Sequence, residues 1–152
     1  MVSKAKQLYE LQGIDLEIET ERRALRWVEA QLGESEALIE LRARLSREKA
    51  LLEELERKQR GGEWEIEDLR TRAATIEDKL YGGSIRNPKE LEKLQQEMEH
   101  LKARQRELED RVLDVMSEIE DARKAISIRG MELARAEEEW NREQAKLLKE
   151  QS

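Results

Sequence analysis

Apolar residues recur at alternating steps of three and four along most of this chain. In the second half they run from Leu91 through Met98, Val112 and Ile126 to Leu147 in one unbroken register. This spacing places them on a narrow stripe along one face of an α-helix, which is typical of a coiled coil. The pattern predicts one helical arm over residues 88–150.

The first half carries a similar stripe with one interruption. Its apolar positions are Leu11, Ile14, Ile18, Leu25, Val28 and Leu32, and the pattern then resumes at Leu38 and continues to Leu80. Leu32 and Leu38 are six residues apart, where a continuous heptad needs seven. Gly33 is a suitable helix stop and Ser35 a suitable restart cap. We therefore expect an arm over residues 3–80 that is kinked or broken near residues 33–35.

The segment between the arms carries helix stop and start signals. Gly82 and Gly83 can adopt the left-handed backbone that ends a helix. Asn87 is a good N-cap, Pro88 suits the first helical position, and Lys89 and Glu90 follow in the first turn, where Glu90 could complete a capping box. A turn over residues 81–87 between two heptad arms predicts an all-α fold, a single long antiparallel coiled-coil hairpin covering residues 1–152.

Facing pairs can be assigned by counting outward from this turn. The count places Gly62 opposite Gln105 and Leu55 opposite Val112, and beyond the break it places Val28 opposite Trp140 and Leu32 opposite Ala136. The second arm then ends opposite about residue 16, which leaves three apolar residues without a partner in the chain: Leu8, Leu11 and Ile14. We expect further protein after residue 152, or another subunit such as a second copy in a dimer, to cover this end.

Composition agrees with a thin helical structure. Of the 152 residues, 43% are charged and 3% aromatic, and the formal net charge is −7. Acidic and basic residues are interspersed, which argues against tight binding to nucleic acid. The sequence has no apolar run long enough for a membrane span and no secretion signal, so we expect a cytoplasmic protein with no membrane contact.

The candidate chemistry is sparse. The chain has no cysteine and a single histidine, His100, which the register places on the outer face. No nucleophile and base, phosphate loop or metal-ligand spacing accompanies it. We therefore expect no enzymatic activity, no cofactor and no metal site in these residues.

Two groups of residues are candidates for partner contacts. The register places Trp27 and Trp64 on the outer face, where a tryptophan is either an interface residue or lies flat over a neighbouring turn. At the turn, Tyr81, Ile85 and Arg86 add apolar and basic surface to the capping residues. This tip either recognises a partner or serves only to cap the two helices.

The turn also carries a family resemblance. The run from Leu80 to Gly83, the Asn87-Pro88-Lys89-Glu90-Leu91 motif, and the later Leu94-Gln95-Gln96-Glu97-Met98 and Leu108-Glu109-Asp110 segments resemble the bacterial four-cysteine zinc-ribbon family, which includes flagellar regulators. The resemblance implies an amino-terminal coiled-coil hairpin followed by a zinc ribbon. It also implies association with the nitrogen-type alternative sigma factor, nucleic acid, or flagellar and type III secretion components. Because this chain has no cysteine, zinc is expected only in a carboxy-terminal ribbon that the sequence does not contain.

These observations favour a non-enzymatic scaffold or protein-interaction module of a zinc-ribbon regulator linked to transcription or to flagellar or type III secretion. A mechanical spacer or self-association coiled coil is the first alternative. A helical arm that binds nucleic acid is the second, and the acidic balance of the chain argues against it.

Overall fold

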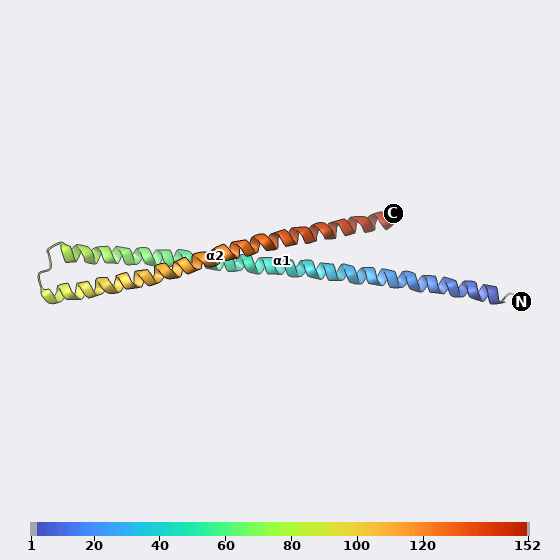
Figure 1. Ribbon diagram of the computed structural model, residues 1–152, viewed down its shortest axis with the longest axis horizontal. Helices are drawn as coiled ribbons and strands as arrows, with labels where there is room; N and C mark the ends of the chain where they lie inside the picture. Colours follow the sequence, from blue (N-terminus) through green and yellow to red (C-terminus); the bar gives the residue numbers. More distant parts are fainter. Residues whose placement is uncertain (1–2, 152) are drawn as a thin grey trace. The chain divides into compact units, whose positions relative to one another are not determined.

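The protein is a helical hairpin. The computed structural model describes residues 3–151, which form helix α1 (Ser3–Tyr81) and helix α2 (Pro88–Gln151) joined by the loop 82–87 (Figure 1). No strand occurs within these described residues. The all-α hairpin predicted from the heptad pattern is confirmed.

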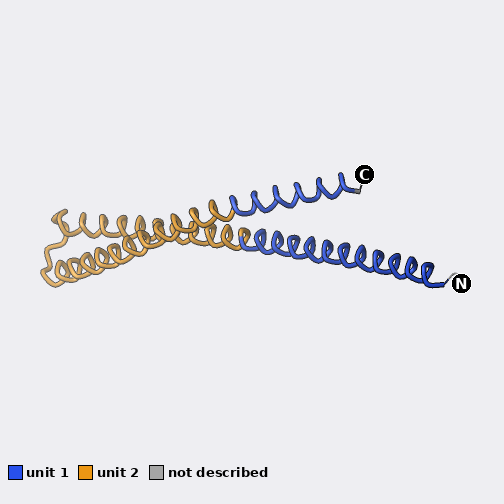
Figure 2. The backbone as a smooth tube through the Cα atoms, turned by 45° about the vertical axis from the view of Figure 1, so that its right-hand side comes forward, with its two compact units in different colours: residues 1–44, 130–152 blue, residues 45–129 orange. Residues whose placement is uncertain are grey.

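Contacts between Cα atoms divide the hairpin into two compact units, each containing part of both helices (Figure 2). Unit 2 comprises residues 45–129 and includes the loop. Unit 1 comprises residues 1–44 and 130–152. The two units are described separately below.

The core of unit 2 is a row of apolar clusters between antiparallel α1 and α2. Each cluster takes residues from both helices, and the buried members are Leu55, Ile66, Leu69, Ala73, Ile76, Met98, Leu108, Val112, Ile119 and Ala122. All of them belong to the heptad positions read from the sequence. Most charged residues lie at the outer positions, so burial follows the narrow stripe that the pattern predicts.

The pairing register within unit 2 differs from the predicted one by a heptad. Gly62 faces Val112, whereas counting from the turn opposed it to Gln105. Similarly, Leu55 shares a cluster with Ile119, not with Val112. Registers that differ by seven residues bury the same kinds of side chain, so the apolar pattern alone does not distinguish them.

In unit 1, the α1 residues that face α2 continue the same steps of three and four without a slip. Gln31 bonds with Gln144, Arg42 pairs with Glu137, and Leu38 is buried beside Ala136. The predicted pairs of Val28 with Trp140 and Leu32 with Ala136 are therefore wrong. Both Val28 and Leu32 are exposed.

The expected interruption near residues 33–35 is also corrected, since α1 is continuous through Gly33 and Ser35. A glycine inside a helix costs about 1 kcal/mol relative to alanine. A break would instead leave several backbone N–H and C=O groups without helical partners. The helix therefore continues through Gly33. As a result, the six-residue step between Leu32 and Leu38 turns the apolar stripe before Gly33 away from α2.

Candidate protein-interaction surfaces

Glycine ends α1 at the tip of the hairpin. The Gly82 N–H donates to the Asp78 carbonyl at 2.8 Å, and Gly83 has a φ of 71°, in the left-handed region. A Cβ at position 82 would lie 2.5 Å from the Asp78 carbonyl oxygen. Both positions therefore require glycine, the first because of space and the second because of backbone conformation.

Asn87 begins α2. Its Oδ1 accepts from the Lys89 N–H at 3.1 Å, and its carbonyl accepts from the Leu91 N–H at 3.1 Å. Pro88 is the first helical residue, and Glu90 lies in the first turn, where a negative charge is favoured by the helix dipole. These bonds orient the loop between two well-capped helix ends.

The end of α1 and the loop together present a small surface of three residues, which we call the tip surface: Tyr81, Ile85 and Arg86. Tyr81 is 81% exposed, Arg86 is exposed and Ile85 is half-buried. None of these three side chains caps a helix, because the capping bonds come from Asn87 and Gly82. The tip surface is thus available to a partner molecule.

The tryptophans differ in their surroundings. Trp64, in unit 2, is 71% exposed, whereas Trp27, in unit 1, is 38% exposed. Trp140 is half-buried and lines a hollow with Leu38 and Ala136. Of the two candidate contacts, Trp64 offers the larger accessible ring.

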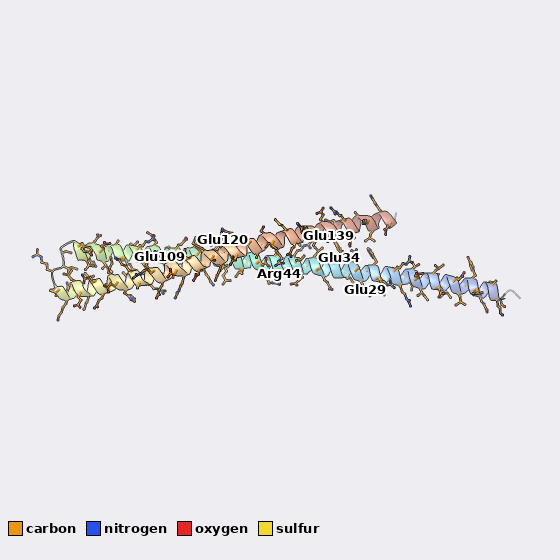
Figure 3. The ribbon with its side chains drawn as sticks, in the orientation of Figure 1. Glu29, Glu34, Arg44, Glu109, Glu120 and Glu139 are labelled. Carbon is orange, nitrogen blue, oxygen red and sulfur yellow. The ribbon has the colours of Figure 1, made fainter. Side chains whose placement is uncertain are left out.

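Carboxylates crowd the same hollow in unit 1. Glu34 of α1 and Glu139 of α2 both line it, and Figure 3 labels these two side chains. The pKa of the Glu34 carboxyl is raised by a side-chain hydrogen bond with Glu143, by desolvation, and by repulsion from Glu143 and Glu139. Like charges therefore meet across the two helices at this point.

Opposite charges meet at another point of the helix interface. In unit 2, Arg129 Nε donates to Glu48 Oε1 at 3.2 Å, and both side chains are largely buried. More exposed pairs join Arg70 to Glu109 and Arg123 to Glu56. Sequence reasoning missed the Glu48–Arg129 pair, although opposite charges on the apolar stripes of both arms were a visible signal.

The amino-terminal part of α1 carries exposed apolar side chains. Leu8, Leu11 and Ile14, which the sequence left without partners, are exposed. So are Ile18, Leu25, Val28 and Leu32, although the last two were expected to pack on α2. The uncovered face is therefore longer than the register count predicted.

The described residues contain no candidate metal cluster and no candidate membrane span. Within the described residues, no group of three or more His, Cys, Asp and Glu side chains could hold a metal ion. None of the helical segments that the structure describes has an apolar stretch of the length that a membrane crossing requires.

Two long helices paired through heptad stripes define the chain as a coiled-coil hairpin domain. Residues 5–151 match the family model of the CT398-like coiled coil hairpin domain, and the chain belongs to this family. Neither a curated protein nor a solved structure was found to match it. The family match covers both helices and the loop, and it supports a structural or interaction role.

Proposed function

We propose that this chain is a non-enzymatic scaffold that binds a protein partner through the tip surface, with Trp64 as a second contact. The observation that carries the proposal is the exposure of Tyr81 and Arg86 on a loop fixed at both ends by capping bonds. Rigid elements that present an exposed aromatic and an arginine are typical of interface hot spots.

The resemblance to four-cysteine zinc-ribbon regulators suggests the partner. On that basis we propose a bacterial, cytoplasmic protein whose partner is the nitrogen-type alternative sigma factor or a flagellar or type III secretion component. Zinc and nucleic-acid binding by a ribbon are not assigned to this chain, which has no cysteine. The net charge of −7 favours a protein partner with basic surface over nucleic acid.

Binding of purified sigma factor to the immobilised chain tests this proposal. We expect Tyr81→Ala and Arg86→Ala each to weaken binding by tenfold or more, because truncating hot-spot residues typically costs more than 1 kcal/mol. Leu113→Ala is the matched control, since Leu113 is an exposed apolar residue of the same unit outside the tip. It should leave binding unchanged.

Full binding by both tip variants would contradict the role of the tip surface. No binding by the unaltered chain would remove the sigma factor as partner, and the same titration with a purified secretion component would then test the second branch. A Trp64→Ala variant assigns or removes the second contact in the same assay. Circular dichroism of each variant verifies that the hairpin remains helical.

A further inference from the structure

The apolar face in the amino-terminal part of α1 is a complete heptad stripe with no cover in the chain. We call it the N-terminal seam, and it consists of Leu11, Ile14, Ile18, Leu25, Val28 and Leu32. Ile18, the least exposed of the six, is 43% exposed, and Leu25 is 59% exposed. Glu21 occupies the single polar step of the stripe.

Two features of unit 1 leave this seam uncovered by α2. The α1 residues facing α2 in unit 1 include Gln31 and Glu34, and the seam residue Leu32 lies one position away from Gln31. One residue corresponds to a rotation of about 100° around an α-helix. Leu32 therefore points away from the side on which α2 packs. With Gln31 opposite Gln144, the last described residue of α2, Gln151, lies opposite about residue 24. No described part of α2 therefore lies opposite Leu11, Ile14 or Ile18.

We propose that a second copy of this chain covers the N-terminal seam, and that the two seams pair as an antiparallel two-stranded coiled coil. In this alignment Leu11 faces the second copy's Val28, and Ile14 faces the second copy's Leu25. The two-fold symmetry repeats each contact. Five of the six seam residues of each copy are then covered by apolar or mixed contacts with the other.

The charges beside the seam favour this orientation. Asp15 and Arg22 occupy equivalent flanking positions, and antiparallel pairing places Asp15 of each copy beside the other copy's Arg22. In that alignment Glu17 lies beside the uncharged Ala24. Among the described residues, neither Asp15 nor Arg22 forms an ion pair within its own chain, so both are available to a second copy.

Parallel pairing of the same seams is disfavoured. It would place the two Glu21 side chains directly opposite each other in the middle of the interface. It would also bring Glu10 of one copy beside Asp15 of the other, and this repulsion offsets the attraction between Glu17 and Arg22 in the same alignment. Antiparallel pairing avoids the repulsion between the Glu21 side chains, because it places each Glu21 opposite Ile18 of the other copy. The polar residue on the seam therefore favours the antiparallel orientation.

Sedimentation equilibrium of the full chain tests the pairing. We expect a monomer–dimer equilibrium that shifts to monomer on dilution. Ile14→Gln and Leu25→Gln should each raise the dissociation constant tenfold or more, without loss of helix, because these side chains are exposed in the single chain. Leu16→Gln is the matched control, since Leu16 is 64% exposed and lies off the seam.

A chain that stays monomeric at every concentration would overturn the proposal, as would a dimer that Ile14→Gln and Leu25→Gln leave intact. Dimer formation and partner binding can be measured independently, because the N-terminal seam and the tip surface share no residue. Loss of sigma-factor binding in the tip variants with an unchanged dimer would affect only the proposed function.

Disulfide crosslinking determines the orientation, and the absence of native cysteine makes it specific. We expect a Leu11→Cys/Val28→Cys variant to form covalent dimers on mild oxidation, while neither single variant does. Positions 11 and 28 are about 25 Å apart along one helix, far beyond disulfide reach within one chain. Covalent dimers of Leu11→Cys alone would show parallel pairing and overturn the antiparallel assignment.

Charge reversal provides an independent test of orientation. Asp15→Arg and Arg22→Asp should each weaken the dimer, and the double variant should restore it, because each opposite-charge pair is re-formed with its signs exchanged. In a parallel dimer Asp15→Arg would instead lie beside Glu10 of the other copy and strengthen the dimer. A dimer strengthened by Asp15→Arg alone would contradict the antiparallel model.

Discussion

Two adjacent glycines in α1 show how local space decides the role of a residue. A Cβ at Gly62 would lie 2.6 Å from Val112 Cγ2, whereas one at Gly61 would meet nothing within 4 Å. Gly62 thus permits close approach of the helices in unit 2. Gly61 has no such role, and its cost to the helix has no structural compensation.

We expect opposite effects from the same substitution at these two positions. Gly61→Ala should stabilise the hairpin by about 1 kcal/mol through helix propensity. Gly62→Ala gains the same propensity but forces the stiff, buried Val112 to move, and should destabilise it by about 1–3 kcal/mol. Chemical denaturation compares the two variants. Equal stabilisation by both would contradict the close contact at Gly62.

The carboxylates around Glu34 give unit 1 a pH dependence. Because the Glu34 pKa is raised in the folded chain, the folded state binds its proton more tightly than the unfolded state does. This group therefore destabilises the fold above its raised pKa, and the penalty is relieved as pH falls through that pKa towards the ordinary glutamate value. The contribution to stability thus increases on acidification from pH 7.

Fluorescence of Trp140 in a Trp27→Phe/Trp64→Phe background reports on this region, since Trp140 lines the same hollow as Glu34. We expect Glu34→Gln to raise the thermal unfolding midpoint at pH 7. The midpoint of this variant should also increase less on acidification than the midpoint of the parent chain does. Glu36→Gln, an exposed neighbour on α1, is the control. An identical pH profile in Glu34→Gln and the parent chain would exclude the carboxylate contact as its cause.

At the scale of elements, the two helices and their ends follow closely from the sequence. The helical pattern predicts α2, and the glycines and Asn87 mark where α1 stops and α2 starts, because cap and stop signals act through local backbone bonds. The break expected near residues 33–35 does not occur, since α1 is continuous there. Gly33 weakens a helix only slightly, and interactions on both sides carry the helix across it.

The buried charge pair should set the strength of pairing between the helices. Arg129→Leu alone removes the charge-assisted hydrogen bond to the largely buried Glu48 carboxylate and should destabilise unit 2 by about 1.5–3 kcal/mol. Glu48→Leu/Arg129→Leu should recover most of that loss, because apolar side chains fit the stripe.

Urea denaturation of the single and double variants measures this coupling. Arg123→Leu, which removes the exposed pair with Glu56 at 3.9 Å, is the control and should change stability by about 0.5 kcal/mol or less. Additive effects of Glu48→Leu and Arg129→Leu would show that the two side chains do not interact.

At the scale of the whole molecule, the class of fold follows from the sequence but the register does not. Every seven-residue shift places apolar stripes against each other again, so the choice depends on the few stripe positions that are not large apolar residues and on what lies opposite them. Gly62 against Val112 and Glu48 against Arg129 are two such contacts in unit 2. The tip residues could be identified from their place in the turn between the two arms. The full extent of the N-terminal seam became visible only once the pairing register of α1 and α2 was known.

The central claim is therefore that α1 and α2 pair in one register, which leaves the tip surface and the N-terminal seam for other molecules. Intramolecular disulfide formation in two double-cysteine variants tests it most directly. Leu55→Cys/Ile119→Cys should crosslink readily within one chain, because both residues share a cluster, and Leu55→Cys/Val112→Cys should not. Crosslinking of the second variant and not the first would establish the register one heptad away and contradict the account.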